Sequence, residues 1–569
     1  MTATPVGRAI VDALEAEGVT TVFGIPGGHI LPIYDAVYSS PRMTSILVRH
    51  EHAAAAMAAA YAQLTGTPGA VLVTAGPGVT NVVTAVAEAY VGALPMIILA
   101  GRGSTATVYR GASQEVGTDQ ILRPVTKWSA RVDRADLVVP AIRQAFAISR
   151  SGKPGPVLIE VPRDILAQRT EISRYVPAGA PGRMAADPVL VSRAAQALAA
   201  ARRPLLIAGG GVLASAASAA LVRLAEQLFS PVLTSLAGRG AIPEDHPLAA
   251  GGLGAHRNWL SKQLLAESDV IAGLGARFEE METNWQPSAL PPSDATYIQV
   301  DIDPSELGRS VPADIVLAGD LRTVLEQILA EPGPVGGLPA PGARERAARV
   351  AAAVAELDAE AEALASRAGP VIHPAQVIRL ARRVFPRDTI LGVDVGVSAQ
   401  QIGGAFPFFR VYDPRSTVVP SSFYGMGFVT AAIPAAGLVH PGRPALCFTG
   451  DGSFQMVSSI LQVAAEYRLA VTWCVLNDDG LGSIWDIQHH TYQDRIIDTI
   501  FPVQPDLAGL ARSSGCYGER VEAADEVEPA LTRALKANSE GRPAVVDVRV
   551  SRERLNQTIE HYVSTYPQP

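Results

Sequence analysis

The sequence predicts an α/β fold made of three doubly wound parallel-sheet domains, and three observations lead to this prediction. Short runs rich in Val, Ile and Leu alternate with Ala-rich helical stretches along the chain, which is typical of parallel sheets covered by helices. The chain has 569 residues, too many for one hydrophobic core and suited to about three domains. Segments rich in Pro and Gly separate the three parts.

Two joints divide the chain into the predicted domains. Residues 175–187 and 332–341 are rich in Pro and Gly, which favour linkers over packed elements. The polar tail is expected either to close over a site or to be flexible. The predicted domains, followed by the tail, are 1–175, 188–335, 370–550 and 551–569.

The expected strands are short apolar runs, and the expected helices are the Ala-rich or amphipathic stretches between them. Helices are predicted after residue 52, over 344–367 and over 454–467. In chain order, the predicted strands are 44–48, 70–73, 96–99, 157–159, 205–208, 232–235, 270–274, 297–300, 445–448 and 470–476.

Composition excludes several classes of protein. The formal net charge is −8 and no Lys/Arg cluster is present, so no nucleic-acid partner is expected. No apolar run is long enough to span a membrane, and the first residues lack the pattern of a signal peptide. Cys447, Cys474 and Cys516 are expected to be reduced packing residues. The prediction is a soluble, cytoplasmic protein.

A Gly-Asp-Gly turn at 450–452 is the strongest chemical signal in the chain. It ends one expected strand, and Asn477-Asp478 ends the next, with Asp478 lying 27 positions after Asp451. In a right-handed βαβ unit both strand ends open on one edge of the sheet, so the two oxygen ligands face one point. Alone, the turn would indicate only a tight bend. In this context it favours Mg²⁺ clamping a diphosphate.

Glu51 lies at a second strand-to-helix junction. By itself it could be an acid that only stabilises the helix dipole. Two neighbouring features favour a functional carboxylate instead. The alanines after it leave room for close packing against another subunit or a ligand, and residues 74–81, TAGPGVTN, form another Gly-rich turn.

Together these motifs resemble the acetohydroxyacid synthase branch of the thiamine diphosphate enzymes, in which GDG is followed by NN or ND. The resemblance implies a pyrimidine-binding, a central and a diphosphate-binding domain, with thiamine diphosphate and Mg²⁺ as cofactors. It extends in order over nearly the whole chain. The other matching segments are FGIPGG at 23–28, the Glu51 segment, TAGPGVTN, SQE at 113–115, PVTK at 124–127 and GPVLIEVPRDI at 155–165.

The resemblance assigns roles to individual residues. Glu51 would activate the cofactor through N1′ of its aminopyrimidine, and Met426 would prop the cofactor in a bent shape. The metal ligands would be Asp451, Asp478 and the carbonyl of Gly480; many family members carry Asn in place of Asp478. Further cofactor contacts are expected at Pro26, Gly76, Gly425, Gly450, Gly452, Ser453 and Asn477.

The resemblance also places two residues beside the reacting carbon. Gln114 falls where family members carry a side-chain amide. His29 departs from the small residue usual in the synthases and is similar to the His of benzaldehyde lyase, where it and the Gln handle proton transfer. An imidazole that titrates near neutral pH suits such a shuttle, although a His in a turn is more often a cap or a surface residue.

Three positions depart from the synthases. Met281 stands where they keep an Arg for the acceptor 2-oxoacid, and Ala255 replaces a Met. The Trp that favours 2-oxobutyrate appears as Ile487, unless Trp485 substitutes for it. Loss of a bidentate partner for a carboxylate weakens selection of an anionic acceptor.

The central domain leaves FAD or ADP binding open. A run of three glycines, 209–211, and Asp301 each follow an expected strand, as in nucleotide sites. Some relatives bind FAD or ADP at this place, and others keep the fold empty.

The predicted function is a thiamine diphosphate- and Mg²⁺-dependent lyase or carboligase that decarboxylates a 2-oxoacid and joins the acyl unit to an aldehyde or ketone. The alternatives are acetolactate synthase proper, a flavin-using oxidase or cyclic-diketone hydrolase on the same scaffold, and a catalytically silent homologue. The expected partners are small molecules and copies of this chain. The family places the cofactor between the first domain of one subunit and the last of another, which implies at least a homodimer and usually a homotetramer.

Overall fold

The structure, a computed structural model, describes residues 3–171, 175–179, 182–331, 341–367, 369, 371–397 and 402–554. The predicted tail from residue 555 and nearly all of the predicted joint at 332–341 lie outside these residues. The chain forms two compact units. The first comprises Met1–Gly182, Pro420–Pro441 and Val457–Leu469, and the second comprises Arg183–Val419, Gly442–Met456 and Ala470–Pro569.

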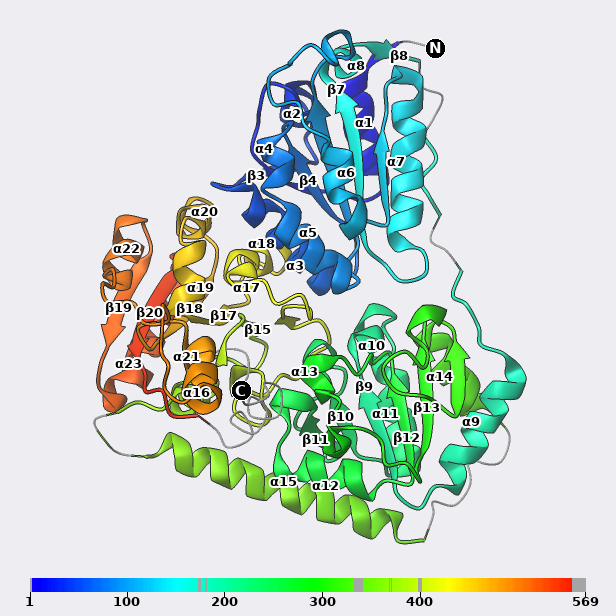
Figure 1. Ribbon diagram of the computed structural model, residues 1–569, viewed down its shortest axis with the longest axis vertical. Coiled ribbons are helices and arrows are strands. Elements are labelled where there is room, and N and C mark those ends of the chain that lie inside the picture. Colours follow the sequence, from blue (N-terminus) through cyan, green and yellow to red (C-terminus); the bar gives the residue numbers. More distant parts are fainter. Residues whose placement is uncertain are drawn as a thin grey trace. The chain divides into compact units, whose positions relative to one another are not determined.

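Three six-stranded sheets form the framework of the protein (Figure 1). Every ladder within them is parallel, and helices cover both faces. The predicted fold class is therefore confirmed. The strand orders are β3-β2-β4-β5-β7-β6, β11-β10-β9-β12-β13-β14 and β16-β15-β17-β18-β20-β19.

The first sheet, blue to cyan in Figure 1, is packed on both sides. Helices α1, α2 and α7 share one apolar core with one face of the sheet, and α3 packs on the other, where Tyr61 meets Phe23 edge-to-face. The strands are β2 (Thr21–Gly24), β3 (Thr44–Leu47), β4 (Gly69–Val73), β5 (Met96–Arg102), β6 (Trp128–Arg131) and β7 (Pro156–Pro162). The helices are α1 (Val6–Ala16), α2 (Leu31–Tyr38), α3 (Glu51–Thr65), α4 (Pro77–Thr80), α5 (Val83–Val91), α6 (Thr118–Leu122), α7 (Ala135–Arg150) and α8 (Arg163–Leu166). A short antiparallel pair, β1 (Thr4–Pro5) and β8 (Arg169–Thr170), completes this part.

The alanines of α3 allow it to be buried along most of its length. Helices α17 (Phe428–Ala432) and α18 (Ala435–Val439), which belong to the same compact unit, pack closely against it. A side chain larger than methyl would hold these helices apart. The close packing predicted from the alanines is thus present, and its partners in this structure are helices of the same chain.

The central sheet has the strand order of dinucleotide-binding folds. Its strands are β9 (Pro204–Ala208), β10 (Val232–Thr234), β11 (Ala249–Gly252), β12 (Val270–Leu274), β13 (Thr296–Asp301) and β14 (Ile315–Ala318). Its helices are α9 (Pro188–Ala200), α10 (Gly210–Ala214), α11 (Ser218–Leu228), α12 (Trp259–Glu267), α13 (Glu280–Thr283) and α14 (Leu321–Ala330).

The third sheet repeats the connectivity of the first, so that the first and third strands of each lie side by side. Its strands are β15 (Ile390–Val393), β16 (Thr417–Val418), β17 (Ala445–Gly450), β18 (Val471–Asn477), β19 (Tyr517–Val521) and β20 (Ala544–Arg549). The associated helices are α15 (Ala343–Ala365), α16 (Pro374–Val384), α19 (Asp451–Met456), α21 (Gly482–Thr491), α22 (Leu507–Ser513) and α23 (Val527–Ser539).

One predicted helix is divided. The stretch 454–467 was expected to be continuous, but α19 ends at Met456 and α20 (Ile460–Glu466) begins after a turn. Ser458 and Ser459 lie in the break, and serine is a poor residue for a helix interior because it competes for backbone hydrogen bonds. The break separates α20 from α19, whose first residue is Asp451.

The three cysteines are free and buried, as predicted for packing residues: Cys447, Cys474 and Cys516. Within the described residues, no helix combines the length and apolar character needed to cross a membrane.

A buried histidine makes the stability of the second unit depend on pH. The Nδ1 atom of His373 caps α16 by accepting a hydrogen bond from Ala375 N at 3.0 Å, and burial lowers the pKa of His373 to about 4. The unfolded chain, in which a His pKa is about 6.5, therefore takes up the proton first. We expect the stabilisation that neutral His373 gives to the folded state to be complete above about pH 6.5 and to decline towards pH 4.

His373→Asn tests this expectation because Asn keeps an acceptor at the cap and does not titrate. Its thermal midpoint should fall less between pH 7 and pH 5 than that of the wild type, whereas His373→Ala should be less stable at both pH values. An equal fall in the wild type and in His373→Asn would contradict the assignment.

Candidate active site

The carboxyl edge of the first sheet gathers the predicted residues of the first domain. The FGIPGG loop leaves β2, Glu51 follows β3, and Gly76 follows β4. Because β2 and β4 are neighbours, with β3 beyond β2, the direction of the connections reverses between β2 and β4. This switch point is where doubly wound sheets bind ligands.

Glu51 is held in a defined orientation as the first residue of α3. The residue is 9% exposed, and its Oε2 accepts a hydrogen bond from Asn81 Nδ2 at 2.8 Å. The preceding His50 caps the helix by accepting from His52 N. Burial, together with the nearby charge of Glu51, raises the pKa of the Tyr34 phenol. Asn81 was noted in the sequence only as part of a motif; its contact with Glu51 depends on the fold.

His29 and Gln114 come together at the same edge, although they are far apart in sequence. Burial, and then the charge of Arg163, lowers the pKa of His29, while a hydrogen bond with Gln114 opposes that shift. The Nδ1 atom of His29 is buried and has no hydrogen-bond partner among the residues that the structure describes. The imidazole is thus uncharged near pH 7, with one nitrogen left for another group.

Two glycines, Gly101 and Gly76, allow the backbones of His29 and Gln114 to lie close to the edge of the sheet. A Cβ on Gly101 would lie 2.4 Å from the His29 carbonyl oxygen. Gly76 has φ +55°, and a Cβ there would lie 2.6 Å from the Gln114 carbonyl oxygen. Any larger residue at either position would push the His29–Gln114 pair away from the sheet edge.

Glu88 fixes the turn that leads to Met426. Its carboxylate, buried on α5, accepts hydrogen bonds from Ser421 N at 2.9 Å and Gly425 N at 2.5 Å, and another from the Ser421 hydroxyl. A Cβ on Gly425 would come within 3.2 Å of Glu88 Oε1. Glu88 was not among the residues predicted from the sequence, because an acid within an apolar helix indicates burial without identifying its partner.

In the second unit, Asp451 and Asp478 follow neighbouring strands, as predicted. β17 and β18 run in parallel with Gly450 opposite Leu476, so both acids lie at one edge. Asp451 Oδ2 accepts from Gly480 N at 3.1 Å and from Gln504 Nε2 at 2.5 Å. Asp451 Oδ1 is buried, and no described residue donates a hydrogen bond to it. Burial, and then the charge of Asp478, raises the pKa of Asp451 to about 7.

An acceptor atom buried without a donor fits a cation. Within the described residues, no group of three or more His, Cys, Asp or Glu side chains is arranged to hold a metal. Asp451 and Asp478 supply two carboxylates, and Mg²⁺ takes one or two carboxylates together with other oxygens such as those of a diphosphate.

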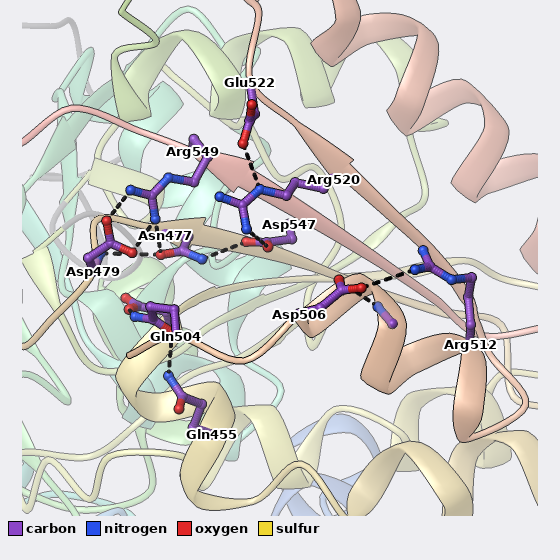
Figure 2. Close-up of polar contacts among 12 residues, drawn as sticks. Gln455, Asn477, Asp479, Gln504, Asp506, Arg512, Arg520, Glu522, Asp547 and Arg549 are labelled. Atoms are coloured by element: carbon purple, nitrogen blue, oxygen red, sulfur yellow. Dashed lines mark hydrogen bonds and ion pairs between the residues drawn. The ribbon is translucent and has the colours of Figure 1, made fainter. Parts of the chain in front are cut away.

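Asn477 and Ser453 support the surrounding backbone. The Asn477 amide donates to Asp547 Oδ1 at 2.8 Å and its oxygen accepts from Arg549 at 2.9 Å, and Figure 2 shows both contacts. Ser453 Oγ donates to the Val395 carbonyl at 3.2 Å. The side chain of Asn477 is therefore engaged within the protein.

The central sheet brings together two of the positions that depart from the synthases. Ala255 lies in a 3₁₀ turn, η4 (Gly254–His256), that packs against α13, which carries Met281. A Cβ on Gly254 would lie 2.0 Å from the Met281 carbonyl oxygen. Met281 is flanked in the sequence by three glutamates: Glu279, Glu280 and Glu282.

Three family models match the chain in order. They are described as Thiamine pyrophosphate enzyme, N-terminal TPP binding domain, over residues 4–122; Thiamine pyrophosphate enzyme, central domain, over 191–328; and Thiamine pyrophosphate enzyme, C-terminal TPP binding domain, over 398–548. The chain belongs to the thiamine pyrophosphate enzymes and, by its relatives, to their acetolactate synthase-like branch.

These relatives share about a third of their residues with the chain. A probable acetolactate synthase large subunit of Methanocaldococcus jannaschii is 34% identical, over 95% of this chain and 91% of its own length. The acetolactate synthase isozyme 3 large subunit of Escherichia coli is 33% identical, over 95% and 94%. The resemblance found in the motifs is confirmed, and the protein is an enzyme of the thiamine diphosphate-dependent decarboxylase and carboligase class.

Glu88→Ala should destabilise the protein by about 3 kcal/mol, because the partly buried donors of the 421–425 turn lose their acceptor. Glu88→Gln should cost less, since one side-chain oxygen remains. Urea unfolding measures both changes. Glu466→Ala is the control: it removes an exposed pair with Arg49 and should cost under about 1 kcal/mol. Equal effects of Glu88→Ala and Glu466→Ala would contradict the proposed clamp.

Proposed function

We propose that this enzyme decarboxylates a 2-oxoacid and transfers the resulting acyl unit to an uncharged aldehyde or ketone. The observation that carries the choice of acceptor is Met281, which stands where the synthases keep an Arg for the carboxylate of the acceptor.

The charges around Met281 support a neutral acceptor. Arg277 is paired with Glu279, with Nη1 and Oε1 3.3 Å apart. Burial, and then the charge of Glu279, raises the pKa of Glu282 to about 7. Arg309 Nη2 also lies 3.9 Å from Glu279 Oε1, so Glu279 engages both arginines. With no arginine at position 281, a bidentate partner for the carboxylate of an acceptor is lacking, which favours an uncharged group over a second 2-oxoacid.

Thiamine diphosphate, when bound, supplies the nucleophilic carbon and the electron sink for cleavage of the bond beside the carbonyl. Glu51, oriented by Asn81, would hold a proton at its carboxylate in contact with N1′ of the aminopyrimidine. His29 and Gln114 would move a proton to or from the carbonyl oxygen of the acceptor. The lowered pKa of His29 keeps the imidazole able to accept that proton near pH 7.

The other assignments to the cofactor also belong to the proposal. Asp451, Asp478 and the carbonyl of Gly480 would hold Mg²⁺. Met426, presented by the turn that Glu88 fixes, would support the bent cofactor. Further contacts would come from Pro26, Gly76, Gly425, Gly450, Gly452, Ser453 and Asn477.

The assembly and location follow from the same family pattern. A cofactor held between the first domain of one subunit and the last domain of another requires at least a homodimer, and a homotetramer is the usual form. The free, buried cysteines suit a reducing compartment, which supports a cytoplasmic location.

Acetolactate synthesis is the second candidate, and the names and identities of the relatives favour it. It differs in the acceptor, which would be a second 2-oxoacid. The two candidates share the donor and the residues around Glu51 and Asp451, so only acceptor preference separates them.

The proposed reaction needs no flavin, because joining an acyl unit to a carbonyl is redox-neutral. The glycines of the central domain have a local explanation. A Cβ on Gly209 would lie 2.0 Å from the Gly275 carbonyl oxygen, and one on Gly211 would lie 2.7 Å from Gly275 Cα. Asp301 Oδ1 accepts from Asp303 N at 2.9 Å within a turn. These glycines and Asp301 are therefore explained by local contacts, and binding of FAD or ADP would be a further role for them.

Release of CO₂ from a panel of 2-oxoacids tests the function, with thiamine diphosphate and Mg²⁺ each added or omitted. We expect release that depends on both, and a mixed product when an aldehyde is present. Acetolactate from pyruvate alone, unaffected by aldehydes, would favour the second candidate. No release from any 2-oxoacid would contradict both.

Met281→Arg should shift the choice of acceptor, because it adds the cation that the synthases keep. With pyruvate as donor, the ratio of 2-oxoacid-derived to aldehyde-derived product should rise about tenfold or more. Met281→Leu, which keeps the site apolar, is the control. The same product ratio in Met281→Arg and Met281→Leu would contradict the inference that charge at position 281 selects the acceptor.

Glu51→Gln should lower turnover by about 10²-fold or more, because a carboxylate that can share a proton is replaced by an amide. Asn81 can still donate to the amide oxygen, so the thermal midpoint should change little. Steady-state rates and circular dichroism measure the two effects. A fully active variant would exclude the proposed role of Glu51.

A further inference from the structure

Three arginines from one short segment hold the loop that carries Asp478. Arg549, at the end of β20, pairs with the Asp479 carboxylate and donates to Asn477 Oδ1 at 2.9 Å; Figure 2 shows both contacts. Arg552 donates to the Asp478 carbonyl at 2.7 Å. Arg554 donates to the Asp478 carboxylate itself. The loop from Asn477 to Asp479 is thus fixed residue by residue.

The contact of Arg554 is the most deeply buried of the three. Its side chain is 2% exposed, and those of its partners Asp478 and Asp486 are 7% and 1% exposed. Arg554 Nη2 lies 3.0 Å from Asp478 Oδ2, and Nε lies 2.7 Å from Asp486 Oδ2. One guanidinium therefore links two acids that follow β18.

The space for this pair is provided by a glycine. A Cβ on Gly482, the first residue of α21, would lie 2.5 Å from Asp478 Oδ2 and 2.9 Å from Arg554 Nη2. The segment that carries Arg554 is also attached by its backbone: Ser551 N donates to the Ile372 carbonyl at 2.8 Å, and Val550 N to the Asn477 carbonyl at 3.0 Å. The arginine is held in place by elements on both sides.

Arg554 explains how this chain uses Asp at a position where many relatives carry Asn. A carboxylate has two oxygens, and Arg554 occupies Oδ2, which leaves Oδ1 for a metal. An Asn amide has one oxygen and one NH2 group, so with its oxygen on a metal it presents a donor, and not a second acceptor, to an arginine. The additional negative charge of Asp478, close to that of Asp451, is also offset by the guanidinium.

We propose that Arg554 is a positioning residue of the metal site. It holds Asp478 so that one oxygen faces the cation, and the Asp478–Arg554 pair takes the place of the single Asn of relatives. This inference rests on the proposed function, since it requires that Asp451 and Asp478 bind Mg²⁺.

A double-mutant cycle tests the pairing. Mg²⁺ is titrated by calorimetry into the full-length protein with saturating thiamine diphosphate, using wild type, Arg554→Met, Asp478→Asn and the double variant. We expect each single variant to bind Mg²⁺ at least tenfold more weakly. In the double variant the Asn oxygen is free to face the metal, so its affinity should return to within about threefold of wild type.

This recovery distinguishes positioning from a merely structural role. If Arg554 only stabilised the fold, the double variant would bind no better than Arg554→Met. Arg239→Met is the matched control, since Arg239 is equally buried and pairs with Glu244 at 2.7 Å in the same unit. It should lower the thermal midpoint and leave Mg²⁺ affinity unchanged. Arg554→Lys keeps the charge and should bind Mg²⁺ better than Arg554→Met.

Failure of the proposed function gives a different result. Asp451→Ala should abolish Mg²⁺ binding while the wild type binds; if the wild type does not bind Mg²⁺ with thiamine diphosphate, the metal site itself is wrong. Wild-type binding with unchanged affinity in Arg554→Met, or with additive losses in the double variant, would overturn the role of Arg554 and leave the metal site standing.

Discussion

The alignment of neighbouring parallel strands is the constraint on which the chemistry of this protein depends. Parallel strands end at the same edge of a sheet, so residues that are distant in sequence meet there without any long-range motif. β17 and β18 place Asp451 and Asp478 at one edge, and β2, β3, β4 and β5 place His29, Glu51, Gly76 and the loop of Gln114 at another. The first and third sheets share one strand order, and in both the candidate residues follow strands at or next to the point where the order reverses.

Burial of charge is the second constraint, and the protein meets it with specific partners. Glu88 accepts three hydrogen bonds from one turn, Glu51 is oriented by Asn81, and Arg554 links Asp478 to Asp486. Removing one partner from such a contact costs more than the contact contributes, because the remaining group stays buried. Asp451 Oδ1 is one of the buried side-chain atoms that have no hydrogen-bond partner among the described residues, and a bound cation would supply that partner.

Close backbone contacts give the candidate residues their positions. Gly101 and Gly76 let the backbones of His29 and Gln114 lie against the strand ends, and Gly482 leaves room for the Asp478–Arg554 pair. In the central domain, close backbone contact at glycines has a different consequence. Gly209 and Gly211 pack closely against the backbone of Gly275. This packing of one loop against another accounts for a run of glycines that resembles a nucleotide-binding motif.

The sequence by itself determined the fold class, the family, the strand ends that carry Glu51, Asp451 and Asp478, and the burial of the cysteines, because alternating apolar runs and short motifs are local signals. It missed several strands, including the edge strands β6 and β19, and it joined α19 to α20, because edge strands and helix breaks depend on what packs against them. Only the tertiary structure decided which residues serve others: Asn81 for Glu51, Glu88 for the 421–425 turn, and Arg554 for Asp478. These partners lie far apart in sequence, and no local pattern specifies which polar group a buried charge will meet.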